Sequence, residues 1–199
     1  QNGAPTALSI ILVTPDAARS MNTFLGASIE FQPEDINPAA ADASVIYLEC
    51  YLYDGPAGPA IFAKAAQMAA QYHARIALSL SDPWCVDRHR ADLLHYVTDH
   101  VDILFANEDE AISLVKADHP TSVKMLRGLV DEVVITRGPL GAVICHAGQQ
   151  ISVDAMPQGP VIDTTGAGDL FAAGYLFGRT HDYDAQKSGQ IASMLAGEV

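Results

Sequence analysis

Short apolar runs alternate with segments of helical spacing along most of this chain, and that rhythm restricts its fold more than any other feature. The run from Val45 to Leu48 is short and contains β-branched residues, which favours a buried strand over a helix. A helix is predicted next, because Gly58 and Pro59 supply a start signal and apolar residues then recur at helical spacing. The alternation predicts further strands at residues 76–80, 101–105 and 133–136, and helices at residues 87–100, 108–117 and 121–129.

The C-terminal part adds a hairpin and two helices to this pattern. Residues 142–145 and 150–153 are apolar runs separated by Ala147 and Gly148, which predicts an antiparallel hairpin. Helices are predicted at about residues 167–178 and 184–196. Because strands alternate with helices, we predict an α/β fold with a mostly parallel sheet and helices on both faces.

Composition indicates a globular chain with one main domain. The 199 residues are 49% hydrophobic and 18% charged, so we expect a single α/β domain over residues 1–199 with one sizeable core. We predict a strand at residues 8–14, although the sequence does not identify the strands beside it. We predict a surface loop at residues 32–43, which contain Pro33, Pro38 and several acidic residues. Apolar runs are far shorter than the roughly 20 residues of a membrane-spanning helix, and no signal pattern is present. We therefore expect a cytoplasmic protein without a membrane partner.

Charge and cysteine content argue against several classes of site. Eleven Lys and Arg against 24 Asp and Glu give a formal charge of −13, which would repel a nucleic-acid backbone. A nucleotide can still bind, because helix N-termini, Mg²⁺ and oriented amides hold phosphates without a basic surface. The three cysteines are odd in number and far apart in sequence, so we expect buried free thiols and no disulfide framework. The histidines lack the spacing of a helical zinc site.

Polar residues follow three of the predicted strands, where an open α/β sheet binds its ligands. The first group begins at Asn107, the second at Thr136, and the third at Asp163, just before a helix. In the third group, small residues leave the amides of residues 166–168 free to bind an anion, with help from the helix dipole. The carboxylate of Asp169 can accept a hydroxyl proton beside that anion.

Each group also has a purely structural explanation. The glycines of the third group can form a tight turn, and Asp169 can cap a helix without touching a ligand. Asn107 can likewise be a helix cap followed by solvated acids. The turn after Thr136 needs only a glycine in a left-handed conformation.

The third group, residues 163–169, matches every fixed position of Asp-Thr-x-Gly-Ala-Gly-Asp, the signature of PfkB/ribokinase-type carbohydrate and nucleoside kinases. Residues 107–110 resemble the Asn-x-x-Glu element of that family, and residues 136–141 resemble its Thr-x-Gly-x-x-Gly turn. Residues 11–16 and 21–27 are similar to bacterial members called adenosine kinases. The order of the three motifs favours a functional site, and the resemblance implies a three-layer, ribokinase-like α/β fold.

The resemblance implies ATP-dependent phosphoryl transfer to a hydroxyl of a nucleoside or sugar, with an adenosine-like acceptor as the first candidate. It implies that Asp169 is the catalytic base and that the anion hole consists of Gly166, Ala167 and Gly168. It further implies Mg²⁺ held through water by Asn107 and Glu110, and a monovalent cation such as K⁺ beside Asp163 and Thr165. The residues implied in ATP binding are Asn107, Glu110, Thr136, Arg137, Gly138, Gly141 and Gly168.

Three alternative functions stay open at this point. A sugar kinase of the ribokinase or fructokinase type would carry the same motifs. A non-catalytic nucleotide- or sugar-binding module would usually have lost the base, whereas Asp169 is intact. A dinucleotide-dependent oxidoreductase could use Gly166 and Gly168 to begin a Gly-x-Gly-x-x-Gly fingerprint, but Phe171 occupies the third glycine position.

Members of this family have about 300 residues and begin with a Gly-rich acceptor-binding segment and a separate β-sheet lid. This chain begins with Gln1 and ends at Glu198 and Val199, within the last predicted helix. We therefore expect it to be incomplete at both ends, without the lid sheet, and with an open acceptor side and an unpaired sheet edge. Because an unpaired edge favours association, we also expect a homodimer.

Overall fold

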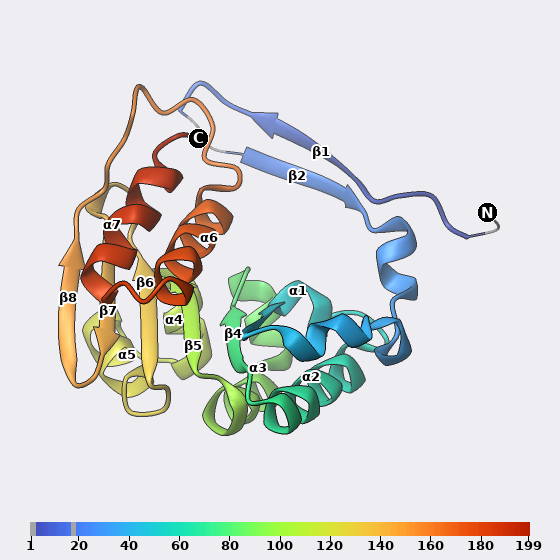
Figure 1. Cartoon of the computed structure of the whole chain (residues 1–199). Coiled ribbons are helices and arrows are strands. Elements are labelled where there is room, and N and C mark those ends of the chain that lie inside the picture. The colour runs from blue at the N-terminus through green and yellow to red at the C-terminus, as the bar shows by residue number, and fades with distance from the viewer. Residues whose placement is uncertain (1–2, 17–18) are drawn as a thin grey trace.

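The structure is a computed structural model that describes residues 3–16 and 19–199. Gln1, used above as a sign of an incomplete chain, lies outside the described residues. A six-stranded sheet in the order β3-β4-β5-β6-β7-β8 forms the centre (Figure 1). The first four strands are parallel and the last two extend the sheet as an antiparallel hairpin, as predicted. The strands are β3 (Val45–Glu49), β4 (Arg75–Ser79), β5 (Ile103–Asn107), β6 (Glu132–Thr136), β7 (Ala142–His146) and β8 (Gln149–Val153).

Helices cover both faces of this sheet, and side chains alternate between two apolar cores along β4 to β7. Ile76 and Leu78 of β4 lie in one core and Ala77 lies in the other. Figure 1 shows α6 and α7 in front of β6 to β8, with α4 and α5 behind them. The predicted arrangement of three layers is therefore confirmed. The helices are α1 (Cys50–Tyr53), α2 (Gly58–Tyr72), α3 (Pro83–His100), α4 (Glu108–Val115), α5 (His119–Leu126), α6 (Ala167–Thr180) and α7 (Ala185–Ala196).

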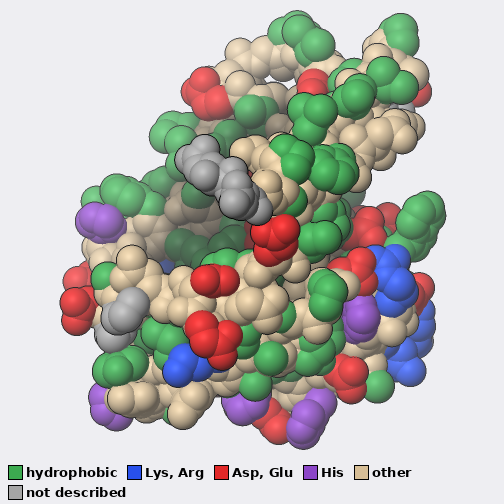
Figure 2. Space-filling view, turned by 90° about the vertical axis from the view of Figure 1, so that its right-hand side faces the viewer, with side chains coloured by type: hydrophobic (Ala, Val, Ile, Leu, Met, Phe, Trp, Pro, Cys, Tyr) green, Lys and Arg blue, Asp and Glu red, His purple; other side chains and the backbone are tan. Residues whose placement is uncertain are grey.

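A second sheet of two strands stands apart from the first. β1 (Leu8–Val13) pairs antiparallel with β2 (Arg19–Phe24), so the expectation that the chain lacks a separate sheet is wrong. The sequence predicts β1 but not its partner, because β2 is mostly polar. Leu8 and Phe24 are direct cross-strand partners and each is more than half exposed. Figure 2 shows hydrophobic side chains gathered on the upper part of the molecule, above a hollow.

Several boundaries differ from the predicted ones, and local caps explain part of the difference. α3 begins four residues earlier than predicted, because the Asp82 carboxylate accepts two backbone N–H groups of its first turn. Glu198 and Val199 lie beyond the end of α7, so the prediction that the chain ends within a helix is wrong. Within the described ranges, no helix is long and apolar enough to cross a bilayer. The region predicted as a loop, residues 32–43, contains short 3₁₀-helices at Pro33–Asp35 and Pro38–Asp42, and a further 3₁₀-helix at Gly26–Glu30 precedes it.

Glu132, the first residue of β6, is a fully buried carboxylate that fastens α6 to the sheet. Arg75 of β4 donates to its Oε2 over 2.9 Å, and Arg179 of α6 donates to its Oε1 over 2.7 Å. The hydroxyl of Tyr175 in α6 donates to Oε1 as well. Burial alone would raise the pKa of Glu132, but these hydrogen bonds outweigh it and hold the pKa below its ordinary value. The cluster anchors the C-terminal half of α6 at the amino end of the strands.

We expect Glu132→Gln to lower the free energy of unfolding by about 3 kcal/mol at pH 7, because two arginines lose their buried carboxylate. Folding lowers the pKa of Glu132. The ionised carboxylate therefore makes its full contribution to the free energy of unfolding above its ordinary pKa of 4.5, and this contribution is lost as the pH falls through the lower pKa of the folded state. The difference between wild type and variant should therefore shrink below pH 4.5.

Urea unfolding of both proteins at several pH values measures this difference. The exposed Glu34→Gln is the matched control and should change stability by less than about 0.5 kcal/mol. Equal stability of wild type and Glu132→Gln at pH 7 would contradict the anchoring role of this carboxylate.

Candidate active site

The N-terminus of α6 borders open space and carries the predicted anion hole. Gly166 precedes the helix with a φ of 85°, a left-handed conformation that glycine adopts without strain. A Cβ atom added at Gly166 or Gly168 would meet no atom within 4 Å. Within the described part of the chain, the amides of these two glycines have no backbone acceptor. Unpaired amides at a helix start can bind an anion.

Ala167 differs from the prediction for this anion hole. Its amide donates to the carbonyl oxygen of Thr164 over 3.2 Å, so it is not free. The amides that can receive an anion at this helix end are therefore those of Gly166 and Gly168.

Asp163 and Thr165 form a local turn just before the helix. Oδ1 of Asp163 accepts the backbone N–H of Thr165 over 2.9 Å and its hydroxyl over 2.7 Å. The hydrogen bonds from Thr165 hold the pKa of Asp163 below its ordinary value. This geometry matches the capping explanation of Asp163. Among the described residues, no group of three or more His, Cys, Asp and Glu side chains is arranged to hold a metal ion.

Asp169 lies in the first turn of α6 and its side chain is exposed. Glu49, the last residue of β3, is within electrostatic reach of it. Burial raises the pKa of Glu49, and the negative charge of Asp169 adds to that rise. The hydroxyl of Tyr47 donates to Oε1 of Glu49 over 3.0 Å. The sequence motifs do not include Glu49 or Tyr47, but the place of Glu49 at the carboxyl end of a parallel strand is a usable signal.

Asn107 and Glu110 cap the start of α4 reciprocally. Oδ1 of Asn107 accepts the Glu110 N–H over 2.8 Å, and Oε2 of Glu110 accepts the Asn107 N–H over 2.9 Å. The side-chain amide of Asn107 also donates to Oε1 of Glu110 over 2.7 Å. Burial raises the pKa of Glu110 to about 7, although the hydrogen bond from the Asn107 backbone opposes the shift. A cation beside this carboxyl group would displace its proton.

The turn after β6 depends on glycine, and its arginine is already paired. Gly141 has a φ of 78°, and a Cβ atom there would lie 1.9 Å from the carbonyl oxygen of Val153. The sequence implies that Arg137 contacts phosphate, but in the structure its Nε donates to Oε1 of Glu108 over 2.8 Å. Binding of a phosphate by Arg137 would require it to exchange that partner.

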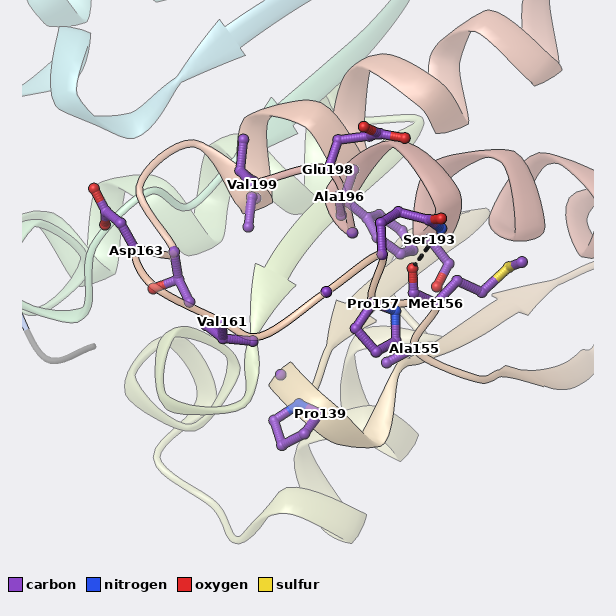
Figure 3. Close-up of a pocket in the computed structure, with 18 of the residues that line it drawn as sticks. Pro139, Ala155, Met156, Pro157, Val161, Asp163, Ser193, Ala196, Glu198 and Val199 are labelled. Atoms are coloured by element: carbon purple, nitrogen blue, oxygen red, sulfur yellow. Dashed lines mark hydrogen bonds between the residues drawn. The ribbon is translucent and has the colours of Figure 1, made fainter. Parts of the chain in front are cut away.

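A cavity of about 1190 Å³ lies beside the N-terminus of α6 (Figure 3). Figure 3 shows the loop with Val161 and Asp163 curving around it, with Pro139 on one side and Val199 on the other. Apolar side chains such as Met156 outnumber polar ones along its walls. An apolar cavity next to an anion-binding helix end suits a ligand that joins an apolar ring to phosphates.

The structure places the predicted site residues in two neighbouring groups at the carboxyl ends of the strands. Asn107 joins the groups, because it is the direct cross-strand partner of Thr136. Residues at this edge but outside the cavity lining are Asn107, Glu110, Arg137, Gly166 and Asp169. Residues that line the cavity are Thr136, Gly138, Gly141, Asp163, Thr165, Ala167 and Gly168.

The small sheet also reaches this cavity. Nη1 of Arg19 in β2 donates to the Thr164 hydroxyl, and Asp16 is part of the cavity wall. The sequence does not predict either contact, because both depend on how the small sheet is placed against the loop before α6.

Comparison with known proteins identifies one family and several related enzymes. The model of a family described as pfkB family carbohydrate kinase matches residues 1–199. A nucleoside kinase of Methanocaldococcus jannaschii is 30% identical over 115 residues, which are 56% of this chain and 37% of that protein.

Two solved structures resemble nearly the whole chain. A probable sugar kinase from Rhizobium etli CFN 42 is 40% identical with a TM-score of 0.93, over 97% of this chain and 59% of the other. The adenosine kinase from Sinorhizobium meliloti is 38% identical with a TM-score of 0.94, over 98% of this chain and 61% of the other. The chain thus spans less than two thirds of these relatives. The likeness confirms the predicted ribokinase-like α/β fold.

We expect the stability of the protein to reflect the raised pKa of Glu110. The folded protein holds this proton more tightly than the unfolded chain between pH 4.5 and about 7. The contribution of Glu110 to the free energy of unfolding should therefore fall as the pH rises from 4.5 to about 7, by roughly 3 kcal/mol at most.

Urea unfolding of wild type and Glu110→Gln between pH 5 and 8 checks this, because the variant has no carboxyl group to ionise at this position. The stability difference between the two proteins should change with pH in favour of the variant at higher pH. The free energy of unfolding of the exposed Glu30→Gln control should depend on pH in the same way as that of wild type. The same pH dependence for Glu110→Gln and wild type would refute the raised pKa of Glu110.

Proposed function

We propose, because the chain belongs to the pfkB family of carbohydrate kinases, that the full-length protein transfers the γ-phosphoryl of ATP to a hydroxyl of a nucleoside or sugar. The observation that carries this proposal is the N-terminus of α6. There, two amides border open space and have no backbone acceptor among residues 3–16 and 19–199, and the exposed carboxylate of Asp169 lies in the same first turn. An anion site beside a proton acceptor is what phosphoryl transfer to a hydroxyl requires.

In the proposed reaction, Asp169 accepts the proton of the acceptor hydroxyl. The hydroxyl oxygen then bonds to the γ-phosphorus while the bond from that phosphorus to the bridging oxygen breaks, and ADP leaves. The amides of Gly166 and Gly168 and the dipole of α6 stabilise the negative charge on the transferring group. Asp169 can be a weak base, because positioning and charge stabilisation supply most of the catalysis.

The cavity beside α6 is the proposed site for the nucleotide. Its apolar walls would hold the base, and the turn from Thr136 to Gly141 would lie along the ribose and phosphates. Arg137 would reach phosphate only after leaving Glu108.

Asn107 and Glu110 provide amide and carboxylate oxygens, which are ligands that Mg²⁺ prefers. Both Glu110 oxygens accept hydrogen bonds from Asn107, so we propose that they hold Mg²⁺ through its waters. When bound, Mg²⁺ would neutralise charge on the phosphates. The turn of Asp163 and Thr165 offers oxygens for a monovalent cation such as K⁺.

The first candidate acceptor is an adenosine-like nucleoside. The 38% identity to the adenosine kinase from Sinorhizobium meliloti and the local similarity to a nucleoside kinase support it. A sugar is the second candidate, because the probable sugar kinase from Rhizobium etli is 40% identical. Glu49, whose pKa is raised further by the charge of Asp169, is the residue we propose to lie on the acceptor side.

The other expectations from the sequence remain proposals. A net charge of −13 supports the absence of a nucleic-acid partner, and we propose a cytoplasmic location without a membrane partner. Within the described residues β3 pairs only with β4, which leaves an edge that supports a homodimer. We propose that residues 1–199 form part of a single nucleotide-binding and catalytic domain.

An assay of the full-length gene product tests the proposed activity. Adenosine, other nucleosides, ribose and hexoses are offered separately with ATP and Mg²⁺, and the formation of ADP and of the phosphorylated acceptor is measured. We expect phosphorylation that requires both ATP and Mg²⁺, with adenosine among the best acceptors. If no acceptor were phosphorylated, the protein would be a binding module instead.

We expect Asp169→Asn to lower kcat by about 10²-fold or more with little change in the affinity for ATP, because the side chain keeps its size but loses the proton acceptor. Steady-state kinetics on the full-length protein measures kcat, and ATP titration measures binding. Asp184→Asn is the matched control, since Asp184 is exposed and caps α7 away from the cavity. A near-normal kcat for Asp169→Asn would rule out Asp169 as the base.

A further inference from the structure

Two of the three cysteines meet in the interior of the protein. The Sγ atoms of Cys50 and Cys85 are 3.4 Å apart although the residues are separated by 35 positions in the sequence, and both side chains are fully buried. Cys145 is buried as well but lies in β7. The kinase mechanism proposed above uses none of these thiols.

The backbone holds the two thiols together from both sides. Cys50 is the first residue of α1, directly after β3, and its N–H donates to the Ser81 hydroxyl over 3.1 Å. Ser81 lies in the turn after β4 with a φ of 61°. Asp82 then caps α3 and accepts the N–H of Cys85 over 2.9 Å. The turns after two neighbouring parallel strands are thus fastened to each other where the sulfur atoms touch.

The two thiols have different surroundings, which give them different roles in thiol oxidation. In the reduced protein the Cys85 thiol is placed to donate to the Cys50 carbonyl oxygen over 3.3 Å. The hydrogen bond between the two thiols holds the pKa of Cys85 below its ordinary value, and the first turn of α3 also favours a thiolate there. The same hydrogen bond and burial raise the pKa of Cys50. Cys85 is therefore the thiol suited to react first, and Cys50 is the thiol suited to resolve the product.

We propose that Cys50 and Cys85 are a site of reversible oxidation that forms an intramolecular disulfide with hydrogen peroxide as the oxidant. The Cys85 thiolate attacks one peroxide oxygen, the O–O bond breaks, and water leaves after protonation, which gives a sulfenic acid. Cys50 then attacks that sulfur, its proton goes to the departing hydroxyl, and a second water leaves. Two thiols are oxidised and one peroxide is reduced, and a dithiol reductant reverses the reaction.

The structure also shows how the oxidant reaches a buried pair. α1 is a single turn of four residues, and its Tyr51 side chain is 55% exposed. Cys50, the first residue of α1, covers Cys85, whose Sγ lies 3.3 Å from the Cys50 carbonyl oxygen. Local opening of this short helix would therefore uncover the Cys85 thiol without unfolding the sheet. Closing the sulfur atoms from 3.4 Å to the roughly 2.05 Å of a disulfide needs only a small shift.

Thiol counting on the native protein tests the proposal independently of kinase activity. After treatment with hydrogen peroxide and removal of the oxidant, we expect titration in denaturant to find two fewer thiols, lost from the 3 in residues 1–199. The intact mass should fall by about 2 Da, and peptide mapping should link Cys50 to Cys85. Dithiothreitol should restore all thiols. The oxidised protein should also unfold several degrees higher, because the link constrains the unfolded chain.

Single variants provide the matched controls. Cys145→Ser should still lose both of its remaining thiols to one disulfide, whereas Cys50→Ser and Cys85→Ser should form none within the chain. An unchanged number of titratable thiols in treated wild type, or a gain in mass at Cys85 without a link to Cys50, would overturn the proposal.

Discussion

The buried charge of Glu132 is the interaction on which the position of the candidate site depends. A carboxylate without water must be neutralised and hydrogen-bonded, and here Arg75 from β4 and Arg179 and Tyr175 from α6 do this together. The cluster fixes one end of α6 at the amino ends of the strands. Because a helix is stiff, its other end, which carries Asp169, is thereby held at the carboxyl ends where the polar groups gather.

Because β3 to β6 are parallel, motifs that are far apart in sequence lie at the same edge of the sheet. Asn107 and Thr136 end neighbouring strands and are direct partners across them. Glu49 ends β3, and its pKa responds to the charge of Asp169 at the start of α6. The cavity beside α6 includes Thr136 at the end of β6, whereas Glu49 ends β3, which forms one edge of the sheet and lies outside the cavity lining.

Structural and functional roles coincide in several of these residues. Asn107 and Glu110 cap α4 and at the same time form a buried carboxyl group with a pKa near neutrality, which a cation would deprotonate. Arg137 holds Glu108 and borders the turn that would carry phosphate. The thiols of Cys50 and Cys85 fasten the turns after β3 and β4, next to Glu49. Changes at any of these residues therefore affect both local packing and the chemistry at the same edge.

The sequence by itself determined the parts of this protein that depend on neighbours a few residues apart. Apolar periodicity predicted β3 to β8 and most helices, and turn residues predicted the hairpin. The three motifs predicted polar groups at the carboxyl ends of the strands, where Asn107 and Thr136 are found. It failed where a local cap moved a boundary, as at Asp82, and where an amide found a backbone partner, as at Ala167.

Only the tertiary structure decided the contacts between distant segments. These include the pairing of β1 with β2, the anchoring of α6 by Glu132, the approach of Glu49 to Asp169 and the contact of Cys50 with Cys85. The physical reason is that periodicity and capping record the local backbone conformation, whereas these contacts depend on strand order and register and on how helices pack across the sheet.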